Sequence, residues 1–192
     1  MTMKQQMQSS AYPLKYADIK KLIVAAPNFR DRCVVKTLFW FGLRREELAE
    51  LDIRDIDFER RRITVRMGKG EKTRVIPCVD EETLNDLRHL IGEHQTGPVF
   101  LSGRNRKFSL RQVNYITQGV GVLAQVQNPN PRLSHINPHI FRHSIARHLK
   151  NLSFSGEFIQ NFLGHESIKT TMDTYGTISI DEMEEMAERR LT

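Results

Sequence analysis

The sequence has little cysteine, no long apolar run and no hydrophobic start. Its two cysteines, Cys33 and Cys78, are widely spaced and form no C-x-x-C pair, which indicates reduced thiols rather than a disulfide framework or a metal site. No stretch approaches the ~20 apolar residues of a membrane-spanning helix. The polar start from Met1 to Ser10 predicts no secretory signal peptide. These absences predict a cytoplasmic protein.

Positive charge, in contrast, is in excess. The chain carries 29 lysines and arginines against 23 aspartates and glutamates, with a net charge of +6 and a pI near 9.5. This balance is typical of a protein that binds nucleic acid, although an ordinary basic soluble protein can have it too. The 192 residues are enough for one domain with a sizeable core.

The most informative stretch begins at Asn137. Asn137 is a good helix N-cap and Pro138 suits the first helical position, so a helix is predicted to begin there. Phe141, Ile145 and Leu149 recur every fourth residue and predict the buried stripe of this helix.

His139 and Arg142 are three residues apart, so they lie on one face of the first helical turn. Free backbone N–H groups and the positive end of the helix dipole point the same way, which predicts a phosphate site. Tyr175 lies downstream and is a candidate nucleophile, but a phenol with a pKa of roughly 10 needs help. Arginines supply that help by neutralising charge in the transition state, and Arg44 is the second candidate.

The rest of the chain is predicted to be helical around one small sheet. Apolar residues alternate at Ile63, Val65 and again at Val75, which predicts a hairpin after a first strand near 53–58. Helical spacing or capping residues predict helices at about 16–26, 31–41, 44–51, 81–91, 110–126, 158–163 and 168–174.

These motifs together resemble the tyrosine recombinases, the phage-integrase and Xer-like family. Any single motif is weak, but six catalytic-type positions in the family's order are specific. The resemblance implies an α+β fold, mainly α-helical, in which a tyrosine-recombinase catalytic domain carries a small antiparallel hairpin or three-stranded sheet. The matching motifs are Gly42-Leu43-Arg44 with Glu47-Leu48, Gly68-Lys69-Gly70 before Arg74-Val75-Ile76-Pro77, His139-x-x-Arg142, Leu163-Gly164-His165 and Tyr175.

The resemblance also implies a DNA strand transferase that forms a 3′-phosphotyrosine and reseals without ATP or a cofactor. Arg44 and Arg142 are expected to clamp the scissile phosphate. His139 and His165 are expected to supply hydrogen bonds or proton transfer, and Tyr175 to attack phosphorus.

Three further residues complete the expected site. Lys69 is expected to protonate the leaving 5′ oxygen from a hairpin tip whose flanking glycines allow close approach. Glu47 is expected to brace Arg44, and His143 to hold a supporting position.

Basic residues outside the site are candidate contacts to DNA phosphates, which position a duplex without reading its sequence. A solvated surface is the alternative for each of them, and it is preferred for Arg60 to Arg62. The candidates are Arg66, Lys72, Arg74, Arg104, Arg106, Lys107 and Arg111.

Other functions stay open at this point. The spacing of His135, His139 and His143 can ligate a metal on a helix, but no carboxylate accompanies them and Arg142 brings a like charge. A type IB topoisomerase would use similar chemistry but rejoin the same strand, as a monomer without a defined paired site, and a DNA-binding regulator could carry a vestigial site. The expected partners are double-stranded DNA and, on paired sites, three further copies of the chain in a homotetramer. Without DNA the chain is expected to associate weakly or to be a monomer.

The domain organisation follows from the same reading. Residues 1–12 are predicted to be a flexible arm and 13–178 the catalytic domain. A capping box at Ser179 to Glu182 begins an amphipathic helix over 179–192, which is expected either to dock on a neighbouring protomer or to pack on its own domain. No core-binding domain is expected, as in a catalytic fragment or a short member such as the fimbrial inversion recombinases. Weak DNA binding with steep salt dependence and a nucleoid-associated location are then expected.

Overall fold

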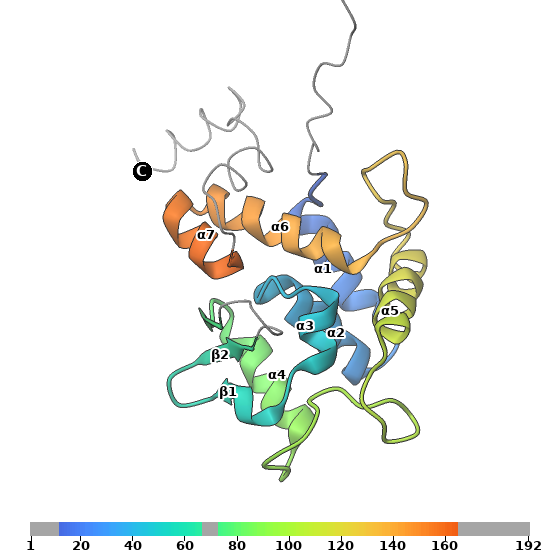
Figure 1. Ribbon diagram of the computed structural model, residues 1–192. Coiled ribbons are helices and arrows are strands. Elements are labelled where there is room, and N and C mark those ends of the chain that lie inside the picture. Colours follow the sequence, from blue (N-terminus) through green and yellow to red (C-terminus); the bar gives the residue numbers. More distant parts are fainter. Residues whose placement is uncertain (1–11, 67–72, 165–192) are drawn as a thin grey trace, which may run out of the picture.

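The computed structural model describes residues 12–66 and 73–164, which form a helical fold around a small sheet (Figure 1). The helices are α1 (Tyr16–Ala25), α2 (Phe29–Trp40), α3 (Arg45–Glu50), α4 (Glu81–Ile91), α5 (Leu110–Leu123), α6 (Pro138–Asn151) and α7 (Gly156–Leu163). The strands are β1 (Ile56–Asp57), β2 (Arg62–Val65) and β3 (Arg74–Pro77), with a 3₁₀ turn, η1, at Ile53–Asp55. This mainly helical fold with a three-stranded antiparallel sheet confirms the predicted fold class.

Helix α2 is the centre of the core. It begins where the Asn28 side chain accepts a hydrogen bond from the Asp31 N–H at 2.9 Å, and it ends before Gly42, whose φ is +57°. Its apolar residues are buried on several faces, since it packs against α1, α3, α4, α5 and α6. Lys36 is buried with them because its ammonium pairs with Glu82 at 2.9 Å and Asp86 at 2.6 Å on α4.

The sheet has the order β1-β2-β3, and both pairings are antiparallel. Ile63 lies opposite Ile56 on one side and Ile76 on the other, so the buried positions of the strands share one face. The predicted first strand at 53–58 was too long. Asp52 accepts a hydrogen bond from the Arg54 N–H at 3.0 Å, and this local cap turns the chain into η1 before β1 begins.

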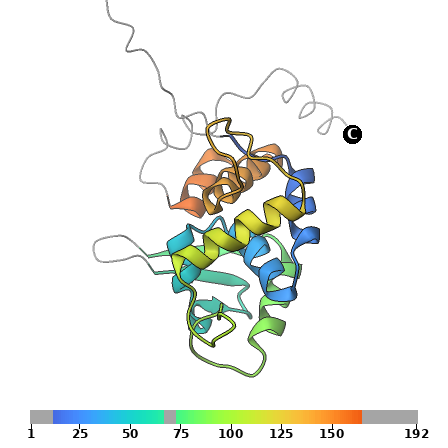
Figure 2. The same cartoon turned by 90° about the vertical axis from the view of Figure 1, so that its right-hand side faces the viewer.

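Helices α6 and α7 lie together on the side of the molecule nearest α1 and α2, with α7 reaching over to β3 (Figure 1). Helix α5 crosses α1, α2 and α3 and contacts α6 (Figure 2). It ends at Leu123, earlier than the predicted 126, because Gln125 takes a left-handed conformation with φ of +52°. This arrangement brings the beginnings of α3 and α6 to one surface.

Two observations concern the predicted compartment and the cysteines. Within residues 12–66 and 73–164, no helix is both long enough and apolar enough to span a membrane. Cys33 and Cys78 are free thiols, and burial raises the pKa of the Cys33 thiol to about 12.

Candidate active site

The beginning of α6 is built as predicted. The Asn137 side-chain oxygen accepts hydrogen bonds from the N–H groups of His139 at 3.0 Å and Ile140 at 3.2 Å. Pro138 occupies the first turn, where its missing N–H is not needed. The predicted stripe of Phe141, Ile145 and Leu149 is fully buried, which fixes the rotation of α6 about its axis.

Arg142 lies beneath the surface at the beginning of α6. Only 2% of the residue is exposed, and its guanidinium donates to the Gly42 carbonyl at 2.7 Å and to the Leu163 carbonyl. A guanidinium is a rigid planar fork, so two carbonyls from different segments define its plane. Arg142 therefore joins α6 to the turn after α2 and to the end of α7.

Arg44 is the N-cap residue directly before α3, and its side chain reaches the surface. Its backbone N–H donates to Glu47 Oε2 at 2.7 Å, and its Nη1 donates to Glu47 Oε1 at 3.0 Å. The Arg44 side chain is 36% exposed, whereas the Glu47 side chain is 6% exposed. Glu47 thus holds Arg44 from below, at both the backbone and the side chain.

The Glu47 carboxylate has a second arginine partner. Arg74 donates to Oε1 from Nη1 at 2.7 Å and to Oε2 from Nη2 at 2.8 Å. Burial alone raises the pKa of the Glu47 carboxyl, but the Arg74 hydrogen bonds and charge, the Arg44 N–H and the Arg142 charge outweigh it and hold the pKa below its usual value. Glu47 is therefore ionised at neutral pH.

Arg74, which the sequence predicted as a DNA contact, lies largely buried beneath the site. Arg74 is only 9% exposed, and its Nε donates to the Phe162 carbonyl at 3.3 Å while its Nη atoms bind Glu47. A guanidinium bound to a buried carboxylate and a main-chain carbonyl faces the protein. We therefore assign Arg74 to the support beneath the site.

His139 stands at the surface above Arg142. Burial lowers the pKa of its imidazole, and the charges of Arg142 and Arg44 lower it further, so the neutral form is favoured at neutral pH. The rings of His139 and His143 meet edge to face with centroids 4.3 Å apart, so the two side chains contact each other.

Arg44 and His139 line one depression of about 380 Å³ between α3, α5 and the start of α6. Arg142 lies beneath it, close enough to influence the charge state of His139. The other lining residues are Arg45, Glu46, Asn114, Gln118, His135, Asn137 and Pro138. The depression combines a partly exposed guanidinium, a neutral imidazole and the beginning of a helix, which suits an anionic group.

Residues 13–180 match the model of the phage integrase family. The chain belongs to the phage integrase family. Over 179 residues this integrase-family chain is 33% identical to tyrosine recombinase XerA of Pyrococcus furiosus, a match that covers 90% of the chain and 59% of XerA. Over 166 residues it is 33% identical to tyrosine recombinase XerC of Pelobacter propionicus, covering 84% of the chain and 52% of XerC.

Solved structures share the integrase-family fold. The crystal structure of XerA recombinase aligns with a TM-score of 0.79 at 27% identity, covering 95% of this chain and 66% of that one. The XerH site-specific recombinase, bound to difH substrate in a pre-cleavage complex, aligns with a TM-score of 0.73 at 19% identity, which is a likeness of fold. That alignment covers 97% of this chain and 55% of XerH, so the chain spans only part of these relatives.

The remaining predicted site residues of this integrase-family chain lie outside the described residues. They are Lys69, Lys72, His165 and Tyr175, together with residues 1–11 of the arm predicted over 1–12, the helix over 168–174 and the terminal helix over 179–192. The structure therefore brings together Arg44, Glu47, His139, Arg142 and His143 of the predicted set.

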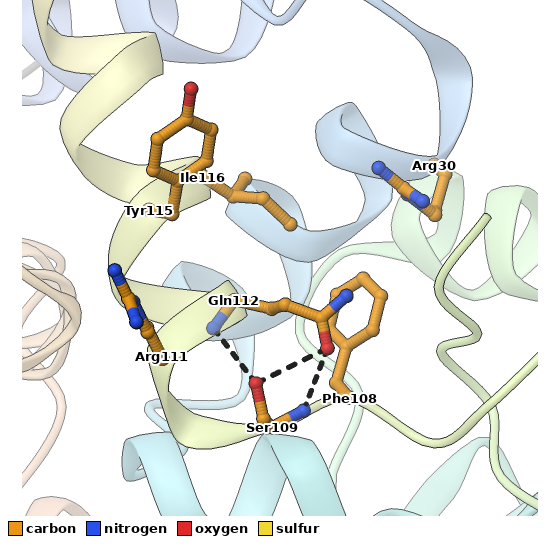
Figure 3. A pocket seen from close by; sticks show the side chains of 7 residues that line it. All are labelled: Arg30, Phe108, Ser109, Arg111, Gln112, Tyr115 and Ile116. Atoms are coloured by element: carbon orange, nitrogen blue, oxygen red, sulfur yellow. Dashed lines mark hydrogen bonds between the residues drawn. The ribbon is translucent and has the colours of Figure 1, made fainter. Parts of the chain in front are cut away.

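The other predicted DNA contacts are exposed on the same integrase-family domain. Arg66 pairs with Asp55, and Lys107 pairs with Glu50 at 2.7 Å. Arg104, Arg106 and Lys107 line a depression before α5. Figure 3 shows Arg111 on α5, beside the cap in which Ser109 and Gln112 exchange hydrogen bonds.

The histidine spacing does not assemble a metal site in the part of the chain that the structure describes. There, no three side chains of histidine, cysteine, aspartate or glutamate gather closely enough to hold an ion. His139 and His143 contact each other instead of converging with a carboxylate.

Sequence reasoning missed the buried role of Arg74 and the lining roles of Asn114 and Gln118. A signal for Arg74 existed, because it alternates in phase with the buried Ile76 on β3. Asn114 and Gln118 are four residues apart on α5 and so share a face, but polar spacing alone does not indicate a site.

Proposed function

We propose that this chain is the catalytic part of a site-specific DNA recombinase that cleaves and rejoins strands through a 3′-phosphotyrosine. The observation that carries the proposal is the depression at which Arg44 and His139 meet above Arg142, in a chain of the phage integrase family. Relatives named as tyrosine recombinases, and a similar fold bound to its difH substrate, support a DNA duplex as the partner.

In the proposed reaction, Arg44 and Arg142 neutralise the charge that grows on the non-bridging oxygens of the scissile phosphate. Arg44 already reaches the surface, held by the ionised Glu47. Arg142 is only 2% exposed, so contact with a phosphate requires a rearrangement around it when DNA binds.

In this reaction each phosphoester bond that breaks is replaced by another, so no external energy source is needed. The Tyr175 phenol oxygen attacks phosphorus while the bond from phosphorus to the 5′ oxygen breaks. A neutral imidazole, His139 or His165, takes the phenol proton, and the lowered pKa of His139 suits that task. Lys69 gives its proton to the departing 5′ oxygen. The reverse reaction, with a 5′ hydroxyl from another duplex, completes the exchange.

We further propose that four copies act together on paired sites, with residues 179–192 docking between protomers. Phosphate contacts from Arg66, Lys72, Arg104, Arg106, Lys107 and Arg111 position the duplex. Because such contacts release counterions, binding is expected to weaken steeply with salt. Work on chromosomal DNA would place the protein in the cytoplasm, at the nucleoid.

The test is covalent capture on nicked DNA. Sequences bound by the full chain are selected from a randomised duplex pool and remade with a nick beside each candidate cleavage position. Wild type is expected to form a DNA adduct that survives denaturing electrophoresis, and Arg44→Ala and Arg142→Ala to form far less.

Tyr115→Phe is the matched control, since Tyr115 lies on α5 with 77% of its surface exposed. It is expected to form adduct like wild type, whereas Tyr175→Phe forms none. An adduct of wild-type yield from Tyr175→Phe would contradict the proposal. Rejoining within one duplex only, without exchange between duplexes, would favour a topoisomerase.

A further inference from the structure

The end of α7 is held by two guanidiniums from different parts of the chain. Arg74 donates from Nε to the Phe162 carbonyl at 3.3 Å, and Arg142 donates from Nη2 to the Leu163 carbonyl. The last carbonyls of a helix have no partner within the helix, and cations there are favourable to its dipole. Two arginines therefore supply donors to the carbonyls at this end of α7.

Arg74 also fits closely against the residue that ends α7. Gly164 takes the left-handed conformation with φ of +66°, and a Cβ placed there would lie 2.7 Å from Arg74 Cδ. Arg74 is the first residue of β3, where it pairs with Val65 of β2. The side chain thus links the end of β2 and β3 that adjoins their connecting segment to the end of α7.

The same guanidinium orients the carboxylate that orients Arg44. Both Glu47 carboxylate oxygens accept hydrogen bonds from Arg74, at 2.7 and 2.8 Å. The same two oxygens accept hydrogen bonds from the backbone N–H and the Nη1 of Arg44. Arg74 and Glu47 are both buried, so their geometry is fixed by surrounding atoms rather than by solvent. A displacement of Arg74 would move Glu47 and, with it, Arg44.

We propose that Arg74 is a positioning residue for strand cleavage: it touches no substrate, and it holds Arg44, through Glu47, in fixed register with the end of α7. This inference rests on the proposed function. It differs from a phosphate contact, which would act on DNA affinity, and from a purely structural ion pair, which would act on stability alone.

A specific consequence concerns pH. The charged groups that act on Glu47 include Arg44 just before α3, Arg74 on β3, Arg142 on α6 and the neighbouring carboxylate of Glu46 on α3. Arg74 contributes the largest share of the attraction that keeps the pKa of Glu47 low. Without its paired hydrogen bonds the Glu47 pKa rises, so a fraction of Glu47 becomes protonated as the pH falls and Arg44 loses its anchor. Cleavage then declines at a higher pH than in wild type.

The principal variant is Arg74→Lys, which keeps the positive charge but loses the planar guanidinium that donates two hydrogen bonds to Glu47. Single-turnover cleavage at saturating DNA is measured across the acid and neutral range, with the slope of DNA affinity against salt. We expect cleavage about 10- to 100-fold slower, because small displacements of a charge clamp carry losses of that order. We also expect an acid limb shifted to higher pH and an unchanged salt slope.

Arg62→Lys is the matched control, since Arg62 lies on β2 and pairs with Asp57 at 3.3 Å on the partly exposed side of the sheet. It is expected to cleave like wild type. Glu47→Gln should slow cleavage as Arg74→Lys does, and the double variant should lose no more than either one, because both act through one contact.

Several results would overturn the inference. One is Arg74→Lys cleaving at the wild-type rate with the wild-type pH profile. A second is a salt slope reduced by about 0.9 with normal cleavage in Arg74→Gln, which removes the charge that Arg74→Lys keeps, because that result marks a phosphate contact. A third is activity lost only in step with melting temperature, with no change in the pH profile.

The proposed function can fail separately. If wild type forms no adduct, the proposed function is refuted. The positioning role of Arg74 can still be tested, by measuring the pKa of Glu47 in the free protein with carbon NMR. A Glu47 pKa equal in wild type and Arg74→Lys would overturn it. If Arg74→Lys does not fold, Glu47→Gln takes its place, and wild-type cleavage from Glu47→Gln would overturn the inference.

Discussion

Gly42→Ala tests whether the turn that carries Arg44 depends on the absence of a side chain. Gly42 has φ of +57°, and a Cβ there would lie 2.8 Å from Leu163 Cδ2 and 3.2 Å from Ile145 Cγ2. Its carbonyl accepts the Arg142 hydrogen bond at 2.7 Å. The added methyl group therefore meets backbone strain and a packed neighbour at once, beside the guanidinium that the site needs.

Gly92 separates the two effects. It has φ of +59° at the end of α4, but a Cβ there meets nothing within 4 Å. Gly92 combines φ of +59° with ψ of −130°, a conformation largely restricted to glycine, which costs a residue with a side chain roughly 1–3 kcal/mol, partly offset by about 0.4–1 kcal/mol from a stiffer unfolded chain. Gly92→Ala should therefore lower the free energy of unfolding by about 1–2 kcal/mol.

Gly42→Ala adds overpacking, which typically costs ~1–3 kcal/mol, so its total loss should be about 2–4 kcal/mol. Denaturant unfolding of both variants measures the difference, and each kcal/mol should lower the melting temperature by about 2–4 °C in a chain of this size. Gly42→Ala should also slow cleavage, because a shift of the Gly42 carbonyl would displace the Arg142 guanidinium that is hydrogen-bonded to it. Equal losses of stability at the two glycines would refute the close packing of Gly42 against α6 and α7.

Three further predictions concern other parts of the chain. Lys69→Ala should slow cleavage by about 10²–10⁴-fold, the usual contribution of a general acid, and sulfur at the 5′ bridging position should restore most of that rate but not the rate of Arg44→Ala; rescue of both or neither would make Lys69 a phosphate contact. Burial lowers the pKa of His148, which stacks on Tyr16 at 4.4 Å, so the unfolded chain binds its proton more readily and stability should fall as the pH drops below about 6.5. His148→Phe should flatten that decline in urea unfolding, and an unchanged decline would contradict the assignment. Deleting residues 179–192 should reduce assembly on paired sites more than cleavage of a nicked duplex, whereas equal loss of folding and cleavage would place that segment in its own domain's core.

The parts of the fold that sequence predicted well depend on local signals. The start of α6 is an example, because the Asn137 cap, Pro138 and the repeat of apolar residues all act within a few turns. The first strand was overestimated for an equally local reason, since the Asp52 cap was not recognised as a competitor of extended backbone.

The support of the site could not be predicted in the same way. The pair of Arg74 with Glu47 joins residues 27 positions apart, and the Arg142 bond to Gly42 joins residues 100 positions apart. A basic residue near a hairpin carries the same local signal whether it faces DNA or a buried carboxylate. Only its alternation with the buried Ile76 indicated the inner face, and the position of Glu47 depends on how α3 packs.

The most direct test of the central claim is to identify the residue that carries DNA in the covalent adduct. The adduct is digested with nuclease and trypsin, and the peptide that bears a nucleotide is sequenced by mass spectrometry. Cleavage after Lys169 and Arg189 yields a peptide over residues 170–189 in which Tyr175 is the single tyrosine. We predict that this peptide carries the nucleotide through its 3′ phosphate on Tyr175, with a free 5′ hydroxyl on the other strand end. A nucleotide on any other residue, or a link through a 5′ phosphate, would contradict the account.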